Sequence, residues 1–248
     1  MSFNDLGLSL ETVRAIEEVG IENPTTVQAD VIPSVLEGKD IFTIAPQRSG
    51  KTYSYVLPLI DMIAQRKVQN ILIITADSFQ ASNVSDCFAV FNKYHKNSDD
   101  DDANVIIATP DLILELEGEQ KLDLERIDVL VVDDINLLKK KHQLGNLEKI
   151  LEKLPADKQN IVFTNRRSKE TQSILDQILK APTEIKIDRN KEDEAFEAQG
   201  RIEAKNQAPA IQITEPKFDS EALEYVKKFQ VFGDKTPHFL LIKGELKR

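Results

Sequence analysis

Residues 41–52 read IFTIAPQRSGKT, an apolar run followed by a loop that ends in Ser49-Gly50-Lys51-Thr52. Residues 53–63 then have the spacing of an amphipathic helix. A strand that turns into a helix through Gly-Lys-Thr is typical of a phosphate-binding loop. In such a loop, backbone N–H groups at the helix start hold the phosphates, Lys51 neutralises their charge, and the Thr52 hydroxyl coordinates Mg²⁺. The stretch therefore predicts a site for nucleotide phosphates.

Two positions in this loop differ from the usual pattern. Ala45 stands where the first glycine is expected, and Arg48 stands where a second glycine is common. Arginine there needs an awkward backbone angle. If the loop accommodates Arg48, its guanidinium adds a phosphate contact; if not, the loop is collapsed and the site vestigial. A third possibility is that Ser49-Gly50-Lys51-Thr52 only starts a helix.

Short apolar runs alternate with segments of helical period before residue 188. The runs occupy residues 41–45, 70–75, 104–108, 127–132, 160–164 and 183–187. Because they are apolar at consecutive positions, they indicate strands covered on both faces, as in a parallel sheet. We predict an α/β fold of the P-loop NTPase type, with helices on both faces of the sheet. Asp133 follows one of these strands, where it could hold Mg²⁺ through water.

The charge is spread unevenly over the 248 residues, which carry a net charge of −10. Residues 189–248 hold 11 basic and 11 acidic residues, so the whole net charge lies on residues 1–188. This excludes a nucleic-acid-binding coat over the entire surface but not a local basic strip. We divide the chain into a domain (1–188), a polar linker (189–218) and a tail (219–248). In the tail we expect a short helix at 220–229 and a strand at 238–242.

The end of the tail is basic and interleaved with phenylalanines, a composition that suits single-stranded RNA or an acidic protein partner. The alternative is that the phenylalanines dock back onto the domain. The candidate contact residues are Lys227, Lys228, Lys243, Lys247 and Arg248.

Cys87 is the single cysteine, so the chain has no internal disulfide and fits a reducing compartment. No apolar run approaches the roughly 20 residues needed to span a membrane. The first residues lack the features of a signal peptide. We therefore expect a cytoplasmic protein that does not enter a membrane.

Residues 20–28 read GIENPTTVQ, and Phe3 lies seventeen positions before Gly20. This arrangement resembles the Q motif of DEAD-box RNA helicases. The resemblance implies a RecA-like domain that binds ATP or ADP. It also implies that Phe3 stacks on the adenine, Gln28 bonds to the adenine edge and Thr25 supports the phosphate loop. The alternative is that Phe3 is a core anchor and Gln28 a helix-surface residue.

The resemblance weakens at the catalytic positions. Asp133-Asp134-Ile135-Asn136 replaces Asp-Glu-Ala-Asp, so Asp134 is one methylene shorter than the glutamate that positions the attacking water. A displacement of about 1 Å at such a group costs on the order of 10²-fold in rate. Asn136 removes the carboxylate that, in the family, links the nucleotide site to Ser-Ala-Thr, here Thr164-Asn165-Arg166. We expect impaired hydrolysis.

The RNA-facing positions change as well. Residues 76–80 read ADSFQ where the family has Pro-Thr-Arg-Glu-Leu, whereas Thr109 and Pro110 remain as candidate RNA contacts. The resemblance covers residues 3–187, one RecA-like lobe. Nothing in residues 189–248 resembles the second lobe, which supplies arginines worth roughly 10³ to 10⁵ in rate.

We therefore expect a single-lobe, ATP-binding accessory of RNA or ribonucleoprotein metabolism, with a protein partner and weak RNA binding. One alternative is an interaction scaffold with an empty pocket. The other is an ATPase completed in trans by a partner.

Overall fold

The computed structural model describes residues 1–95 and 103–187. Six strands form one sheet in the order β3-β2-β4-β5-β1-β6, and every neighbouring pair is parallel. The parallel α/β fold predicted from the apolar runs is confirmed, and the strands lie within two residues of the expected bounds. They are β1 (Ile41–Ile44), β2 (Asn70–Ile74), β3 (Asn104–Ala108), β4 (Val129–Val132), β5 (Gln159–Thr164) and β6 (Thr183–Lys186).

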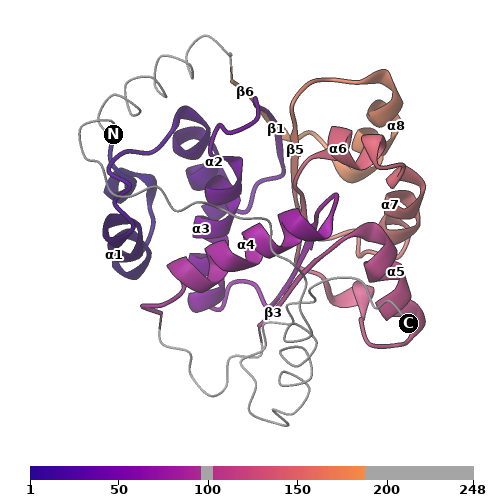
Figure 1. Cartoon of the computed structure of the whole chain (residues 1–248), viewed down its shortest axis with the longest axis horizontal. Coiled ribbons are helices and arrows are strands. Elements are labelled where there is room, and N and C mark those ends of the chain that lie inside the picture. Colours follow the sequence, from indigo (N-terminus) through magenta and orange to yellow (C-terminus); the bar gives the residue numbers. More distant parts are fainter. Residues whose placement is uncertain (96–102, 188–248) are drawn as a thin grey trace, which may run out of the picture.

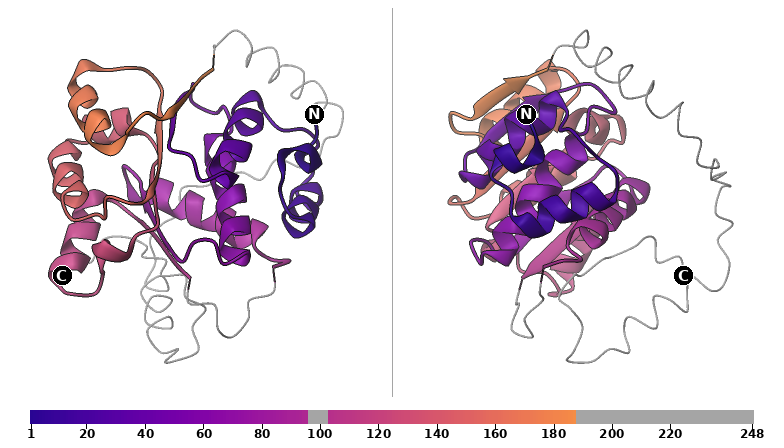
Figure 2. Two further views of the ribbon diagram at one scale, coloured as in Figure 1. Left: turned by 180° about the vertical axis from the view of Figure 1, so that it is seen from behind. Right: turned by 90° about the vertical axis from the view of Figure 1, so that its left-hand side faces the viewer.

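Helices cover both faces of the sheet (Figure 1). One layer contains the 3-10 helix η1 (Phe3–Leu6) and the helices α1 (Leu10–Glu18), α2 (Thr26–Leu36), α3 (Lys51–Ala64) and α4 (Ser78–Phe91). The other contains α5 (Pro110–Gly118), the 3-10 helix η2 (Leu124–Arg126), α6 (Ile135–Lys140), α7 (Leu144–Leu151) and α8 (Lys169–Ile178). The view from behind in Figure 2 shows the same two layers.

The strands are apolar at consecutive positions because each face of the sheet has its own core. Along β2, Ile71 and Ile73 belong to the core shared with α1–α4, whereas Leu72 and Ile74 belong to the core under α5–α8. All four are fully buried. Alternate side chains of a strand point to opposite faces, so a strand covered twice has no polar side.

The register of the strands brings three loops together at one edge. Val132 pairs with Ile74 and with Val162, and Ile44 pairs with Thr164. The residues after β1, β4 and β5 therefore leave the sheet side by side. In open parallel sheets ligands bind beyond the carboxyl ends of the strands, which here carry the predicted phosphate loop and Asp133.

The predicted linker (189–218) and tail (219–248), with the helix at 220–229 and the strand at 238–242, lie outside the described residues. The boundary at 188 stays a prediction. Within residues 1–95 and 103–187, no helix is long and apolar enough to cross a membrane.

Candidate nucleotide-binding site

Gly50 shapes the start of the phosphate loop's helix. It is the residue before α3 and has φ +86°, a left-handed conformation. A Cβ at this position would lie 2.6 Å from Gln28 Nε2 and 2.9 Å from Thr25 Oγ1, so only glycine fits. Among residues 1–95 and 103–187, no side chain caps this helix start. The first N–H groups of α3 have no partner within the helix and remain available to an anion.

Arg48 and Ser49 close the turn before Gly50. Arg48 has φ +64°, the backbone angle expected of a residue in a glycine position, and its side chain is exposed. A left-handed angle costs a residue other than glycine about 1–2 kcal/mol. The buried Ser49 hydroxyl donates to the Pro46 carbonyl at 2.9 Å. The loop is therefore held by its own groups.

Lys51 connects the loop with the end of β4. Its Nζ donates to the carbonyls of Ala45 at 3.3 Å and Pro46 at 3.0 Å. An ammonium has three donors, so one is left for a phosphate. Burial raises the pKa values of Asp133 and Asp134, and the Lys51 charge opposes this increase for both, which places the ammonium near the two carboxylates.

Asp133 is the buried carboxylate of the site. Burial raises its pKa to about 6, an increase that the Lys51 charge opposes and the neighbouring Asp134 charge adds to. A divalent cation would offset the cost of burying this anion, so the site fits the Mg²⁺ that the phosphate loop implies. Thr52 and Asp133 are the residues that would hold it.

Tyr55 belongs to this site but was not found by sequence reasoning. It lies on α3, is fully buried, and its ring packs against Phe163 at a centroid distance of 5.4 Å. Burial raises the pKa of its hydroxyl well above the usual value, and the Asp133 charge adds to this. In the helical spacing of α3, position 55 reads only as an apolar core position.

Asp134 acts as the N-cap of α6. Its Oδ1 accepts from the backbone N–H of Asn136 at 3.0 Å and of Leu137 at 3.1 Å. Burial raises the pKa of Asp134, and these two hydrogen bonds and the Lys51 charge oppose that increase. The carboxylate that stands in the place of the family's glutamate thus has a structural task at a helix start.

Asn136 makes a connection that the sequence did not predict. Its Nδ2 donates to Thr164 Oγ1 at 2.7 Å, to Asn165 Oδ1 at 3.2 Å and to the Arg166 carbonyl at 2.6 Å. The carboxylate expected here is absent, yet β4 and β5 are still joined at this edge, through an amide.

Thr25 and Gln28 bind the carbonyl side of the loop. Together they form the capping box of α2. Thr25 Oγ1 donates to the Ser49 carbonyl at 2.9 Å, and Gln28 Nε2 donates to the Gly50 carbonyl at 3.3 Å. Gln28 Oε1 accepts from the Thr25 N–H at 3.0 Å. The amide of Gln28 is therefore bonded to protein at both ends, and its contact with a base stays a prediction.

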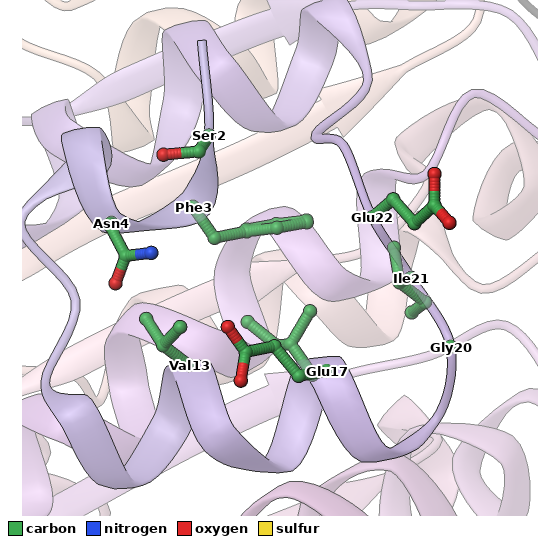
Figure 3. Close-up of a pocket in the computed structure, with 9 residues that line it drawn as sticks. Ser2, Phe3, Asn4, Val13, Glu17, Gly20, Ile21 and Glu22 are labelled. Atoms are coloured by element: carbon green, nitrogen blue, oxygen red, sulfur yellow. The ribbon is translucent and has the colours of Figure 1, made fainter.

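Phe3 lines a cavity of about 430 Å³ between η1, the end of α1 and the following turn. Figure 3 shows its ring above Val13 and Glu17, with Gly20, Ile21 and Glu22 at the far wall. Phe3 is only 3% exposed. The cavity has the volume of a small-molecule site. Stacking of Phe3 on adenine stays a prediction.

The predicted RNA contacts are placed less favourably. Thr109 is half-buried at the start of α5, and Pro110, its first residue, is buried. Asp77 caps α4 and lies 3.8 Å from Lys141. Phe79, which sequence reasoning passed over, is 74% exposed beside Asp77. The basic tail residues lie outside the described residues.

Burial raises the pKa of the free Cys87 thiol to about 11, which keeps it protonated and unreactive.

The parallel sheet, the glycine-capped loop and the buried carboxylate at the end of β4 define a P-loop protein of the α/β class. Residues 25–174 match the DEAD/DEAH box helicase family, and the chain belongs to that family. DEAD-box helicases generally bind ATP with Mg²⁺.

Two curated relatives illustrate the match. The chain is 24% identical over 258 residues to RNA helicase CrhR of Synechocystis sp., an alignment covering 95% of this chain and 52% of the relative. It is 28% identical over 203 residues to ATP-dependent rRNA helicase RRP3 of Encephalitozoon cuniculi, covering 75% of this chain and 51% of the relative. The chain thus spans about half the length of these relatives.

A crystal structure of a DEAD box protein from the hyperthermophile Methanococcus jannaschii has a similar fold. The TM-score is 0.71 at 24% identity, and the match covers 94% of this chain and 71% of that chain. The likeness shows that the fold is RecA-like, as a first RecA-like domain of this family would be.

Proposed function

We propose that this chain binds ATP or ADP with Mg²⁺, hydrolyses ATP poorly, and acts as an accessory in RNA or ribonucleoprotein metabolism. The main support for a nucleotide site is that Lys51 lies near Asp133, beside the uncapped helix start at Gly50. An ammonium, a set of free N–H groups and a buried carboxylate are the groups that a magnesium-bound phosphate chain requires.

Residues 20–28 support a common site for base and phosphates. Gly20, Ile21 and Glu22 line the cavity that contains Phe3. A few residues farther along, Thr25 and Gln28 hold the carbonyls of the phosphate loop. One short segment therefore borders both the cavity and the loop. We assign adenine to the cavity and the phosphates to the loop.

Calorimetry with Mg-ATP and Mg-ADP tests binding. We expect a measurable heat for the wild-type chain and none for Lys51→Ala, because the ammonium contributes a charge-assisted bond to phosphate. Lys67→Ala, at an exposed position beyond the end of α3, is the matched control and should bind as the wild type does. Absence of heat with the wild type would overturn the proposal.

The expectation of poor hydrolysis rests on Asp134. Its carboxylate oxygen is engaged by two N–H groups of α6, and its side chain is one methylene shorter than glutamate. Because of both features, the Asp134 carboxylate reaches less far toward an attacking water beyond the loop. A single-turnover assay should show bound ATP persisting for many minutes. Phosphate release by the chain alone at about 1 per second, within the range of ordinary enzymes, would contradict this.

An interaction scaffold without nucleotide is the second candidate, favoured by the contacts within the loop. Lys51 and Ser49 both donate to the Pro46 carbonyl, so the loop is already closed by its own groups. If nucleotide cannot displace these bonds, calorimetry gives no heat and the scaffold is correct. Completion of the ATPase by a partner in trans stays a prediction, as does a cytoplasmic location.

The proposed RNA contact rests on the names of the relatives and on the basic tail. We expect weak, salt-dependent binding of single-stranded RNA. Replacing the five candidate contact residues of the tail with glutamine in the full chain should weaken this binding and flatten its salt dependence. Equal affinity before and after the replacement would exclude the tail as the source. The residues replaced are Lys227, Lys228, Lys243, Lys247 and Arg248.

A further inference from the structure

The Tyr55 hydroxyl is a polar group buried inside the domain. The side chain is fully buried, and within the described part of the chain its oxygen makes no hydrogen bond. Thr52 and Asp133 lie close enough to affect its pKa, but neither forms a hydrogen bond of ordinary geometry with it. Such a hydroxyl destabilises a fold, because water has been removed and nothing replaces it.

The packing of Tyr55 explains its ring but not its oxygen. The ring fills the space between α3 and β5 and contacts Phe163 at an interplanar angle of 47°. A phenylalanine would supply the same apolar surface without an unpaired oxygen. The reason for the hydroxyl must therefore be sought among its polar neighbours.

Those neighbours are the two residues assigned to Mg²⁺. Thr52 precedes Tyr55 by one helical turn on α3 and so lies on the same side of the helix. Asp133 reaches the same place from the end of β4. The unbonded oxygen thus borders both residues.

We propose that Tyr55 is a positioning residue for the magnesium site, whose hydroxyl donates a hydrogen bond to the Asp133 carboxylate when Mg-nucleotide is bound. This rests on the proposed nucleotide-binding function. The carboxylate has two oxygens, so one can accept from Tyr55 while the other faces the hydrated cation. A fixed carboxylate loses less freedom when the metal arrives.

The test compares Tyr55→Phe with Tyr53→Phe in the full chain. Tyr53 is on the same helix, and its half-buried ring meets Phe91 edge to face at 5.0 Å, so its removal deletes an equivalent hydroxyl elsewhere. The dissociation constant of a fluorescent ADP analogue is measured with Mg²⁺ and with EDTA. Thermal melting without nucleotide is recorded for each chain.

We expect Tyr55→Phe to bind the analogue normally in EDTA but to lose about tenfold of the affinity gained with Mg²⁺, as for one hydrogen bond to a charged group. Its melting temperature without nucleotide should equal or exceed that of the wild type. Tyr53→Phe should keep the full gain. In Asp133→Asn, which lacks the acceptor charge, adding Tyr55→Phe should cause no further loss.

An unchanged magnesium-dependent gain in Tyr55→Phe would refute the role of Tyr55 while leaving the proposed function intact. An equal loss of affinity in EDTA would also refute it, because the effect would not act through the metal. A wild-type chain that binds the analogue under neither condition would refute the proposed function and this role together.

Discussion

The side-chain amide of Asn136 donates a hydrogen bond of 2.7 Å to the Thr164 hydroxyl, across the gap between the ends of β4 and β5. The Thr164 hydroxyl gives its own proton to the Arg166 carbonyl at 2.8 Å, so it has to accept from Asn136. The amide nitrogen also donates to Asn165 and Arg166. Its two N–H donors are shared among three acceptors, whereas a carboxylate would offer these acceptors no donor at all.

Asn136→Asp should therefore destabilise the fold, although it restores the carboxylate that DEAD-box helicases carry. A buried anion would face the Arg166 carbonyl and the Asn165 side-chain oxygen without a donor. We expect the free energy of unfolding to fall by about 2–4 kcal/mol, as for a buried polar group that loses its partners. Urea denaturation at neutral pH measures the change.

Asn83→Asp is the control for this exchange, because Asn83 is exposed on α4. The same chemical change there should alter stability by less than about 0.5 kcal/mol. Equal stabilities of Asn136→Asp and Asn83→Asp would show that the hydrogen bonds of Asn136 do not hold the two strands together.

A substitution at Gly50 tests the shape of the phosphate loop. Gly50→Ala adds a Cβ within 3 Å of both Gln28 and Thr25 and keeps φ +86°. The backbone angle alone costs about 1–2 kcal/mol, and the two side chains must also move. We expect a lower free energy of unfolding and, by calorimetry, loss of Mg-nucleotide binding.

Gly145→Ala is the matched change in α7, where an added Cβ meets nothing within 4 Å. Alanine in a helix is more stable than glycine by about 0.5–1 kcal/mol, so this variant should gain stability and bind nucleotide normally. If Gly50→Ala kept both properties, the tight contact with Thr25 and Gln28 would have no consequence.

The sequence predicts the loop better than the side chains around it. The strand, the loop and the helix at 41–63 follow from local patterns, since apolar runs and Gly-Lys-Thr need no knowledge of distant residues. The unusual backbone angle of Arg48 is likewise a local property. In contrast, the partners of Asn136 are the last residue of β5 and the two residues after it, 28 to 30 positions away, and only the sheet order places them there.

Tyr55 and Asp134 show the same limit. Helical spacing indicates that position 55 faces the core, but it does not reveal that the hydroxyl lies beside Asp133. The strand pattern places Asp134 at the carboxyl edge, but the turn into α6 decides that its oxygen caps a helix. Hydrogen-bond polarity depends on which groups the fold brings together, so it is predictable only after the topology.

The raised pKa of Asp133 predicts a dependence of stability on pH. The folded value of about 6 exceeds the ordinary value of 3.8, so between these pH values the folded state binds more protons than the unfolded state. Stability contributed by this group is present below pH 4 and is lost as pH rises through 6. Two pKa units correspond to on the order of 3 kcal/mol.

Asp133→Asn removes this titration. Relative to the wild type, the variant should therefore become more stable as pH rises from about 4 to 7, and the difference should level off above pH 7. Urea denaturation at a series of pH values in Mg²⁺-free buffer measures this difference. Asp157→Asn makes the same exchange at an exposed position and is the matched control. A flat difference for Asp133→Asn would contradict the raised pKa.

Asp61 is surrounded by hydrogen-bond donors, whereas Asn136 is surrounded by acceptors. The carboxylate is fully buried and accepts from Ser9 N at 2.5 Å, Ser9 Oγ at 2.7 Å and Thr12 Oγ1 at 2.5 Å. His95 Nε2 lies 2.8 Å from Thr12 Oγ1. Since the Thr12 hydroxyl gives its proton to Asp61, the histidine has to donate, which places a proton on Nε2.

Asp61→Asn should therefore detach α1 from α3, because the new amide nitrogen would meet donors instead of accepting from them. We expect a loss of about 2–4 kcal/mol by urea denaturation, and a smaller loss of about 1–2 kcal/mol for Thr12→Val, which removes one donor. Asp61 lies ten residues beyond Lys51 on α3, about 15 Å along the helix, so nucleotide affinity should stay unchanged.

If Asp61→Asn were as stable as the wild type, the carboxylate would not be the anchor of α1. If it lost nucleotide binding while remaining folded, α1 and the cavity beside Phe3 would be coupled to the phosphate loop through this anchor.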